Sequence, residues 1–422
     1  MELKKYRLGE VCTIIPGYAF KSSDFGCGKN WVIKIKDIAP PAINIATADK
    51  VTVTPSNKYK LSKGDYVMAM TGATIGKVGM LQTDISNVFI NQRVCKFVPN
   101  EHICDKTYLY YVLSTQSFKN FIFNNIDSKL AQPNIGHPTI YKYSHLFPNC
   151  IKEQKLIASV LHNLDCKIAL NHAINDNLEA MAKQLYDYWF VQFDFPNEDG
   201  KPYKSSGGAM VWNEKLKREI PQGWSVLSVN DIAASVRGVS YAKDDMVDSN
   251  NGVLVLRGNN IQDNHLIYDS NVAYIPSSFV SENQRIRPLD IIMTMSSGSK
   301  EHIGKSAMFQ FASEDTFGAF LTKFTAKEHC AYLLFNLFNS KYFKAKIKSI
   351  ACGTGINNLT NQTFDEIYVV MPEDELLLEF DKRQSQIFAE IGLIEKSNIE
   401  LTKQRDELLP LLMNGQASVN SD

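Results

Sequence analysis

One segment of the sequence resembles a nucleotide-binding loop, but its spacing argues against that chemistry. Residues 298–306 follow a strand-like run and end in the Gly-Lys-Ser of a P-loop. Five residues separate the two glycines, whereas four are needed for the backbone N–H groups to wrap around a phosphate. A similar segment, Gly72–Lys77, has three residues between its glycines and no hydroxyl residue after Lys77. The sequence therefore predicts a hairpin at both places, and a nucleotide-dependent enzyme is kept only as an alternative.

Other catalytic or metal chemistry is not indicated by the residue patterns. The sequence contains no Asp/Asn-Pro-Pro-Tyr/Phe motif of adenine-N6 methyltransferases and no His-Glu-x-x-His motif, and its eight histidines have no metal-ligand spacing. The eight cysteines form no Cys-x-x-Cys pair, which argues against a zinc ribbon or a secreted disulfide scaffold. No signal peptide and no apolar run near the roughly 20 residues of a membrane helix are visible. We expect a cytoplasmic protein without catalytic or metal-binding residues.

Polar side chains that could pair with DNA bases occur in short loops. Recognition of a base requires paired hydrogen bonds, for which Arg suits guanine, and Asn and Gln suit adenine. The best such cluster is Asn91-Gln92-Arg93. The chain contains an internal repeat at offsets of 221 to 228 residues, and the segment that corresponds to this cluster is Gly318-Ala319-Phe320. That segment has no polar side chain, so the two loops would read different bases. A loop that bonds to its own backbone is the alternative.

Two lysines on a predicted strand form a second candidate surface. Lys34 and Lys36 alternate with isoleucines, so both should point to one face of the strand. Arg257, Asn259 and Asn260 stand at the matching place later in the chain. The alternative is an ordinary solvated strand face.

Hydroxyl groups and lysines in the two predicted hairpins and on one predicted helix complete the DNA-binding candidates. The helix is expected to begin near Tyr332, and its lysines share one face, from which they could contact phosphates. Plain turns and ordinary surface lysines are the alternatives. The candidates are Thr71, Thr74, Lys77, Ser296, Ser297, Lys300 and Lys305 in the hairpins, and Lys341, Lys344 and Lys348 on the helix.

The charge of the chain is zero in total but unevenly distributed. The 422 residues predict two to three domains, and 44% hydrophobic against 21% charged residues predicts folded cores. Residues 1–150 hold 18 basic and 10 acidic side chains, whereas residues 373–422 hold 5 and 11. The first segment has the charge expected of a surface that faces phosphates. An ordinary fluctuation of charge is the alternative.

A comparison of the sequence with itself indicates an internal repeat. Asp65–Met70 matches Asp290–Met295 at an offset of 225 residues, and Asn134-Ile135 matches Asn358-Leu359 at 224. Further matches, in the same order along the chain, have offsets between 221 and 228, as expected when small insertions fall in the loops of a shared scaffold. We therefore predict two mixed α/β modules: a first module at residues 1–150 and a second module at residues 221–372.

Each module is followed by a long predicted helix, at residues 151–192 and 373–414. Hydrophobic residues recur at alternating steps of four and three, which is typical of a coiled-coil seam, and the second series lies 223 residues after the first. Residues 193–220 are rich in Pro, Gly and Ser and form the predicted linker, and residues 415–422 form a tail. The predicted seam includes Ile157, Leu164, Ile168, Asn175, Leu178 and Leu185 in the first helix, and Ile387, Ile391, Ile394, Asn398, Leu401 and Leu408 in the second.

The two helices should pair with each other in antiparallel orientation. Helices of about 40 residues are about 60 Å long, and a parallel pairing would require the linker to run back over that distance. Asn175 and Asn398 occupy the same seam slot, where a buried Asn can fix the register; exposure to water is the alternative. The predicted fold is α+β, with two mixed modules separated by a pair of long antiparallel coiled-coil helices and related by a pseudo-two-fold repeat. Such modules could contact two separated patches of duplex DNA.

The centre of the chain resembles the conserved region of type I restriction–modification specificity (S) subunits. The resemblance is carried by residues 178–191, by Phe195-Pro196 and by Ile220–Trp224. Pro148, together with Glu153-Gln154 and Ile157-Ala158, is similar to the Pro-Pro-x-x-Glu-Gln-x-x-Ile-Ala pattern before the family's spacer helix. Asn149 replaces the second proline, and the second copy has Glu379-Phe380 in place of Glu-Gln.

The resemblance implies a DNA-reading scaffold without a catalytic site. In that family, two target recognition domains each read one half of a split sequence in double-stranded DNA. The helices set the spacing and dock two methyltransferase (M) subunits, which bind S-adenosylmethionine and methylate adenine at N6 after flipping it out. Motor–nuclease (R) subunits can join for cleavage. No cofactor is expected on this chain, and a peptide-binding adaptor without DNA is a further alternative, since the total charge is neutral.

Overall fold

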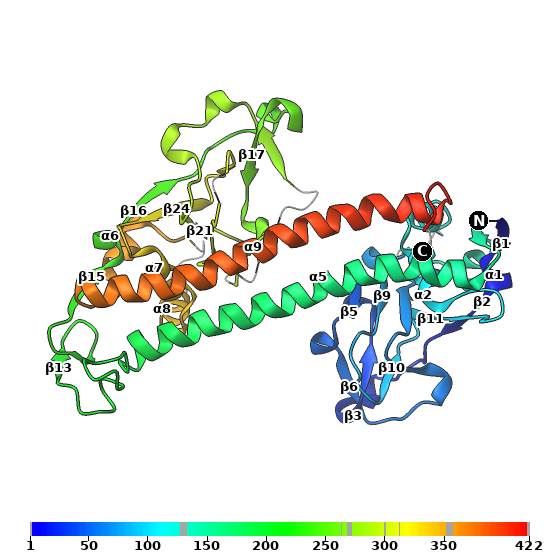
Figure 1. The fold of residues 1–422 in the computed structure, drawn as a ribbon, viewed down its shortest axis with the longest axis horizontal. Helices are drawn as coiled ribbons and strands as arrows, with labels where there is room; N and C mark the ends of the chain where they lie inside the picture. Colours follow the sequence, from blue (N-terminus) through cyan, green and yellow to red (C-terminus); the bar gives the residue numbers. More distant parts are fainter. Residues whose placement is uncertain are drawn as a thin grey trace. The chain divides into compact units, whose positions relative to one another are not determined.

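The computed structural model describes residues 2–126, 133–262, 264–267, 272–298, 301–311, 313–351 and 358–419. The chain divides into two compact units (Figure 1). The first unit joins Met1–Leu170 to Asn398–Asp422, and the second is Asn171–Ser397. Each unit therefore contains one module and one segment of each long helix. Among the described residues, no helix has both the length and the apolar character needed to cross a membrane.

Two sheets form the body of the first module. One has the strand order β2-β11-β8-β9-β5-β4, and the other has the order β6-β3-β10-β7. A separate antiparallel pair, β1 with β12, joins the two ends of the module. The strands are β1 (Leu3–Arg7), β2 (Cys12–Pro16), β3 (Phe25–Ile33), β4 (Ile38–Ala39), β5 (Ala42–Ile43), β6 (Asp49–Val51), β7 (Lys60–Leu61), β8 (Tyr66–Ala69), β9 (Val78–Met80), β10 (Val88–Ile90), β11 (Val94–Pro99) and β12 (Ser144–Pro148).

Helices cover the first sheet of this module. Asp105 begins the main helix, because its carboxylate accepts hydrogen bonds from the backbone N–H groups of Thr107 and Tyr108 at 3.0 Å. All residues from Tyr108 to Leu113 of that helix are buried, in a core that contains strands of the sheet and residues of both long helices. The helices of the module are α1 (Leu8–Val11), α2 (Lys106–Ser114), α3 (Gln116–Asn124) and α4 (His137–Ile140).

The second module repeats this plan with fewer strands among its described residues. Its main sheet has the order β16-β24-β21-β22, which matches β2-β11-β8-β9 of the first module, and β17 pairs in parallel with β23 as β3 does with β10. The strands are β15 (Ser225–Ser228), β16 (Ala233–Arg237), β17 (Val253–Leu256), β18 (Ile261–Gln262), β19 (His265–Leu266), β20 (Ala273–Ile275), β21 (Ile291–Thr294), β22 (Ser306–Met308), β23 (Thr316–Phe317), β24 (Leu321–Ala326) and β25 (Tyr368–Met371), and the helices are α6 (Val229–Ile232), α7 (Ala331–Asn339) and α8 (Lys341–Ala351). The predicted internal repeat is confirmed.

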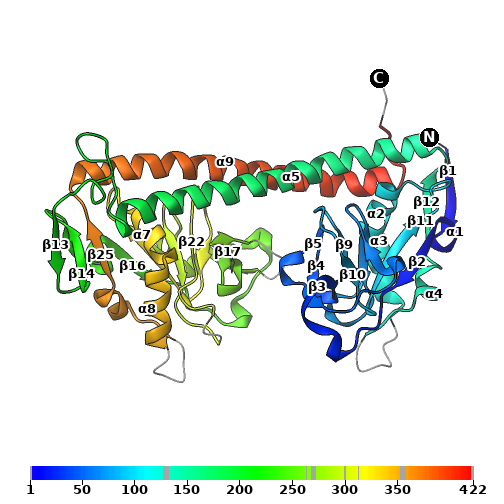
Figure 2. The ribbon, with the colours of Figure 1, turned by 90° about the horizontal axis from the view of Figure 1, so that it is seen from below.

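The long helices are α5 (Ile151–Tyr186), which continues as a π-helical turn at Asp187–Val191, and α9 (Asp374–Met413). In the first unit, Arg405 near the end of α9 lies 3.2 Å from Asp165 near the start of α5. In the second unit, the Gln384 amide in the first half of α9 donates to the Ala182 carbonyl near the end of α5, at 2.8 Å. Within each unit the helices are therefore antiparallel (Figures 1 and 2).

The predicted seam positions are buried or half-buried in both helices. In the first unit, Ile157 and Leu161 share a core with Leu412 and Met413. In the second unit, Phe380 packs on Phe190, with ring centroids 4.7 Å apart. Asn175 and Asn398 are both buried, and the side-chain oxygen of Asn175 has no hydrogen-bond partner among the described residues. Burial of these amides rules out the alternative that they face water.

The segment predicted as a linker, residues 193–220, is folded and packed. Strand β13 (Met210–Asn213) pairs with β14 (Arg218–Pro221) in an antiparallel hairpin. Phe193, Phe195 and Ile220 are buried, and Phe195 stacks on Trp224 with ring centroids 4.9 Å apart. The aromatic residues in this segment explain the difference, because they bury apolar area that a Pro-, Gly- and Ser-rich composition does not suggest.

Candidate nucleic-acid interface

Three segments that are far apart in the sequence meet at one edge of the first module. The backbone N–H of Met70 donates to the carbonyl of Arg93 at 2.9 Å, and that of Ile135 donates to Met70 at 3.1 Å. Thr71 and Asn134 form an isolated antiparallel bridge. We call this meeting point of residues 70–71, 91–93 and 133–137 the first loop junction. It collects several of the residues predicted to read bases.

The second module has the same junction at the matching positions. The N–H of Met295 donates to the carbonyl of Phe320 at 2.9 Å, and that of Leu359 donates to Met295 at 2.8 Å. Ser296 and Asn358 form the isolated bridge that corresponds to Thr71 and Asn134. We call the meeting point of residues 295–297, 318–320 and 358–361, together with the end of β16, the second loop junction. The backbone is therefore repeated, while the side chains on it differ.

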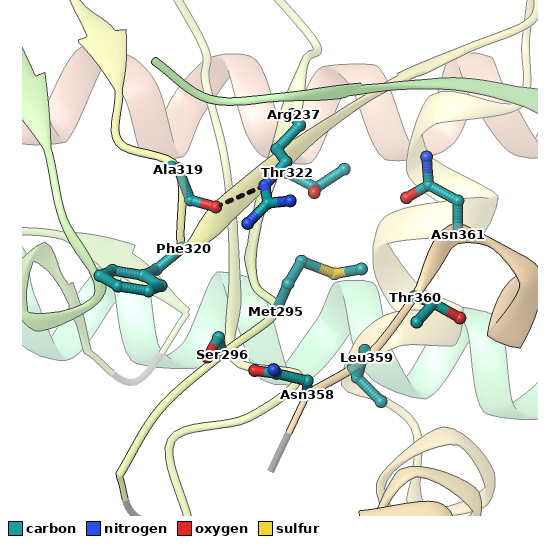
Figure 3. A pocket seen from close by; sticks show the side chains of 10 residues that line it. All are labelled: Arg237, Met295, Ser296, Ala319, Phe320, Thr322, Asn358, Leu359, Thr360 and Asn361. Carbon is teal, nitrogen blue, oxygen red and sulfur yellow. Dashed lines mark hydrogen bonds between the residues drawn. The ribbon is translucent and has the colours of Figure 1, made fainter. Parts of the chain in front are cut away.

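A cavity of about 450 Å³ opens at the second loop junction (Figure 3). Among the described residues, no carboxylate lines it, and Arg237 is its one cationic side chain. Phe320 beside it is 66% exposed. The lining residues are Arg237, Met295, Ser296, Ala319, Phe320, Thr322, Asn358, Leu359, Thr360 and Asn361. The cavity thus offers amides, hydroxyls, a guanidinium and an aromatic face, which are the groups that recognise base edges.

The cluster Asn91-Gln92-Arg93 lies on the turn between β10 and β11. Gln92 and Arg93 are exposed, whereas Asn91 is half-buried. The side-chain oxygen of Asn91 accepts from the N–H of Arg93 at 3.4 Å, so this residue shapes the turn that presents its neighbours. The interpretation that side chains of this loop bond to its own backbone therefore holds for Asn91. Gln92 and Arg93 stay candidates for contact with DNA.

The prediction that Lys34 and Lys36 lie on a strand is wrong. Strand β3 ends at Ile33, and residues 35–37 form a short 3₁₀ helix. The carboxylate of Asp37 ends the strand, because it accepts from the N–H of Lys34 at 2.8 Å and so turns the backbone. Lys34 pairs with Asp49 at 2.7 Å, and this contact lowers the pKa of the Asp49 carboxyl. Lys36 lies 3.5 Å from the same carboxylate. Both lysines are therefore engaged within the module.

The matching place in the second module has the same local structure. Asn260 takes the role of Asp37: its side-chain oxygen accepts from the N–H of Arg257 at 2.9 Å, and its amide donates to the Ile267 carbonyl at 2.8 Å. Asn260 is completely buried, so it cannot contact DNA as predicted. The Nε of Arg257 donates to the hydroxyl of Tyr241 at 2.8 Å. Asn259 is exposed and stays a candidate.

The two predicted hairpins are confirmed, because β8 pairs antiparallel with β9, and β21 with β22. Thr71 and Ser296 lie in the loop junctions, and Ser297 lies next to Ser296. Thr74 donates to the Ile35 carbonyl at 3.5 Å, a long hydrogen bond. Lys300 lies outside the described residues.

The lysine of each hairpin is less well placed for DNA than the hydroxyl residues. Lys77 lines a separate cavity of about 410 Å³ with Asp165 and Arg405 of the long helices. Lys305 is half-buried and follows Gly304, whose positive φ of 75° places the turn against α8. The hairpins therefore present their Thr and Ser ends to the loop junctions and their Gly-Lys ends to the helices.

The three lysines near the end of the second module lie on α8. The helix predicted to begin near Tyr332 is two helices, because α7 ends at Asn339 and the Ser340 hydroxyl accepts from the N–H of Phe343 to begin α8. Lys341, Lys344 and Lys348 are exposed. Phe343 and Ile347 of the same helix are buried, so the lysines occupy its solvent face.

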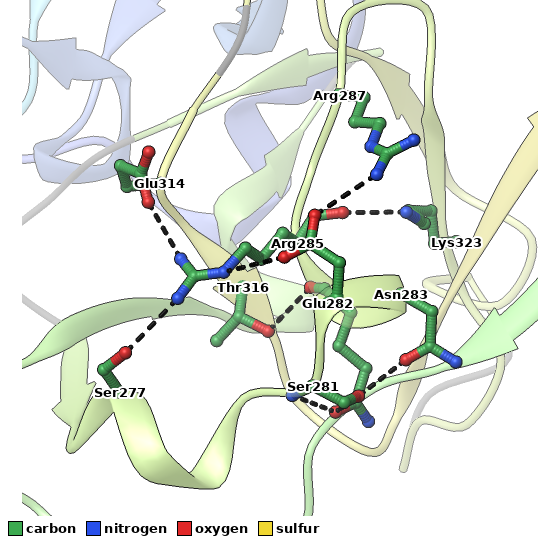
Figure 4. Close-up of polar contacts among 10 residues, drawn as sticks. Ser277, Ser281, Glu282, Asn283, Arg285, Arg287, Glu314, Thr316 and Lys323 are labelled. Carbon is green, nitrogen blue, oxygen red and sulfur yellow. Dashed lines mark hydrogen bonds and ion pairs between the residues drawn. The ribbon is translucent and has the colours of Figure 1, made fainter.

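Not every cation of the second module is available to a ligand. Arg285 lies 2.8 Å from Glu314, and Arg287 lies 3.2 Å from Glu282 (Figure 4). Lys323 points inward to the Arg285 carbonyl at 2.7 Å and to buried Asp290 at 3.1 Å. These side chains neutralise one another around the β20–β21 connection. Arg237, the cation of the second loop junction, differs because it has no carboxylate partner among the described residues.

Arg237, Phe320 and Asn361 are residues of the junction that the sequence comparison did not single out as candidates. Arg237 is the last residue of β16, and the matching residue of the first module is Pro16, at the end of β2. One signal was available: Gly17 and Gly238 follow these residues, and both pack directly on carbonyl oxygens of the neighbouring turn. Glycines at matching places mark a close approach of two backbone segments.

The fold and these junctions define a two-module scaffold with a repeated, carboxylate-poor surface site. The family described as type I restriction modification DNA specificity domain matches residues 1–180 and 221–411. The chain therefore belongs to this family of specificity subunits, which are not themselves catalytic.

Individual relatives support the same family. The MjaIX specificity subunit of Methanocaldococcus jannaschii is 25% identical over 449 residues, covering 95% of this chain and 96% of the relative. The StySPI specificity subunit of Salmonella potsdam is 30% identical over 202 residues, which is 46% of this chain and only 41% of that subunit. The crystal structure of a type I restriction–modification S subunit from M. genitalium has a similar fold, with a TM-score of 0.58 and 15% identity, covering 98% of this chain and 96% of that chain.

Proposed function

We propose that this chain reads a bipartite site in double-stranded DNA, one half with each module. The long helices set the spacing and dock two M subunits, which use S-adenosylmethionine to methylate adenine at N6. R subunits can join this complex, and the chain itself supplies no catalytic group. A cytoplasmic location, where the DNA is, belongs to the same proposal.

The observation that carries this proposal is the pair of loop junctions. Two backbone hydrogen bonds and one isolated bridge are repeated at matching positions, yet the side chains differ: exposed Gln92 and Arg93 in the first junction, and half-buried Ala319 and exposed Phe320 in the second. A shared frame with different side chains suits two readers of unlike half-sites, since base identity is read by side chains in a groove. A pair of modules with one peptide ligand has no need for such divergence.

The electrostatics of the modules agree with a polyanionic ligand. Residues 1–150 carry an excess of eight basic side chains. In the second module, Lys341, Lys344 and Lys348 line the solvent face of α8, and no described residue brings a carboxylate to the cavity at the loop junction. Cations at some distance from the bases can hold the phosphates and set the register of the protein on DNA.

Exposed apolar side chains on α5 and on the π-helical turn that follows it support the docking of M subunits. Ile174, Met181 and Tyr188 follow one another at intervals of seven residues and are 38%, 56% and 37% exposed. The interval of seven places Ile174 and Met181 on one face of α5, and Tyr188 follows on the π-helical turn. A row of apolar side chains on a helix surface is typical of a protein–protein contact.

The nucleotide-dependent enzyme is disfavoured as an alternative. The Gly-Lys segment of each module belongs to a connection between antiparallel strands, whereas a phosphate-binding P-loop passes from a strand into the N-terminus of a helix. Binding of ATP to the isolated chain would support that alternative.

The experiment that tests the proposal is a map of N6-methyladenine in the host DNA with and without this chain. We expect a split motif, with two specified half-sites separated by unspecified bases, that disappears when the chain is deleted. Exchange of one module for that of a relative should change one half-site and leave the other intact. A methylation pattern that does not depend on the chain would contradict the proposal and favour the alternative of a peptide-binding adaptor.

A further inference from the structure

Arg237 is held rigidly at the rim of the second loop junction. Its carbonyl accepts a hydrogen bond from the amide of Gln284 at 3.1 Å. The next residue, Gly238, packs so tightly that a Cβ atom there would lie 2.3 Å from the carbonyl oxygens of Phe317 and Gly318. The end of β16 is therefore held against the turn beside it, so the backbone position from which the Arg237 side chain extends is fixed.

The guanidinium of Arg237 is oriented by one intramolecular hydrogen bond. Its Nε donates to the carbonyl of Ala319 at 3.0 Å. Within the described part of the chain, no acceptor is bonded to its two terminal nitrogens. Figure 3 shows the guanidinium above the cavity, with Asn358 and Asn361 on other walls. The end of the guanidinium thus presents two parallel N–H donors to the cavity.

The groups around the guanidinium suit a base edge better than a phosphate. Phosphate sites usually gather several cations or backbone N–H groups. Here a single guanidinium is surrounded by amides, hydroxyls and the apolar side chains of Met295, Leu359 and Phe320. Two parallel N–H donors match the O6 and N7 acceptors of guanine in the major groove, and an exposed aromatic ring can contact a thymine methyl group.

We propose that Arg237 reads a guanine in the DNA half-site of the second module. The inference rests on the proposed function, because it assigns one base to a site that the function requires. It makes Arg237 the specificity-determining residue of that half-site, and Asn358 and Asn361 then face the neighbouring bases.

The first module places its cation differently at the same junction. Pro16 stands at the position of Arg237, and Arg93 stands at the position of Phe320. The arginine of the junction therefore lies at the end of a strand in the second module and on the adjacent turn in the first. Each arginine would approach its half-site from a different element, so changes to the two residues should affect different halves of the motif.

The test uses the complex of this chain with its M subunits and synthetic duplexes that carry the methylated motif and every single-base variant of its half-sites. We expect Arg237→Gln to lower discrimination at one guanine by roughly 5- to 150-fold, the worth of a good bidentate pair. Arg237→Lys should lose most of the same discrimination, because an ammonium lacks the fork of two donors. Arg93→Gln should leave this guanine position unchanged, since it belongs to the other half-site.

The control is Arg287→Gln, on the same module, where the guanidinium pairs with Glu282 rather than facing the cavity (Figure 4). It should leave discrimination unchanged. If Arg237→Gln weakened all duplexes equally and Arg237→Lys restored binding, Arg237 would be a phosphate contact and the inference would be wrong. A half-site without any guanine would also overturn it. Failure of the proposed function would give a different result, because the wild-type complex would then show no motif that depends on this chain.

Discussion

The ammonium of Lys323 lies 3.1 Å from the carboxylate of Asp290, and both side chains are almost completely buried. The same relationship occurs in the first module, where Lys96 lies 2.7 Å from Asp65. In both modules the lysine lies on the strand after the turn of the loop junction, β11 or β24. The aspartate directly precedes the first strand of the hairpin, β8 or β21. This matched ion pair, buried in the second module and largely buried in the first, links the internal repeat of the sequence to the frame that holds the loop junctions.

We predict that Lys323→Met destabilises the protein strongly. Removal of one partner leaves the Asp290 carboxylate buried without its cation, and such a loss costs about 3–5 kcal/mol. Urea unfolding followed by circular dichroism measures the change. The control is Lys36→Met, because the Lys36 side chain is 52% exposed and its pairing with Asp49 should contribute at most about 1 kcal/mol. Equal effects of the two substitutions would refute this account.

His265 should make the second unit less stable at high pH. Its Nε2 lies 2.9 Å from Glu179 of α5, and its Nδ1 lies 3.3 Å from Glu395 of α9. The hydrogen bond to Glu179, followed by that to Glu395, raises the pKa of His265 from 6.5 to about 10. Because the folded state holds the proton more tightly, this stabilisation is complete below pH 6.5 and is lost as the pH rises toward 10.

The measurement for His265 is the unfolding midpoint of the wild type and of His265→Gln at about pH 6 and about pH 10, on either side of the window set by the two pKa values. The difference between the two proteins should be large at the lower pH and small at the higher pH. His172→Gln changes an exposed histidine of α5 and serves as the control. A difference that does not vary with pH would show that the imidazole acts by packing alone.

Gly238→Ala should disturb the second loop junction. The added methyl group would overlap the carbonyl oxygens of Phe317 and Gly318, and overpacking of this kind costs about 1–3 kcal/mol. Gly298→Ala is the matched control, because no atom of the described part of the chain lies within 4 Å of a Cβ atom at that position. Stability and DNA affinity should both fall for Gly238→Ala only. Normal DNA affinity in a destabilised variant would show that DNA binding does not depend on the packing of this junction.

Met181→Glu should weaken the association with M subunits. The side chain is 56% exposed in the apolar row on α5, so a carboxylate there would be buried in the contact without a partner. Association is measured by titration of the M subunit, with a loss of about tenfold or more expected. Ala180→Glu adds the same charge at an exposed position on another face of the helix and should have little effect. Similar losses for both would indicate a general charge effect.

Much of the fold was predictable from the sequence because the relevant signals are local or repeated. The seam of α5 and α9 follows from the periodicity of a helix, which does not depend on the rest of the chain. The hairpins followed from the Gly-Lys segments shared by the two copies, at Gly76-Lys77 and Gly304-Lys305, since two copies of one pattern support the same structure. The site was less predictable. Lys34 and Lys36 alternate as a strand does, yet the Asp37 carboxylate turns the chain before them.

By itself, the sequence determined the duplication, the two long helices and their seam, and the absence of known catalytic motifs, because these depend on residue type and spacing along the chain. Only the tertiary structure decided which side chains share a surface. Arg237, Ser296, Phe320 and Asn358 meet at one cavity although more than 100 residues separate the first from the last. Their proximity arises from strand pairing and backbone packing between distant segments, and no periodicity in the sequence encodes it.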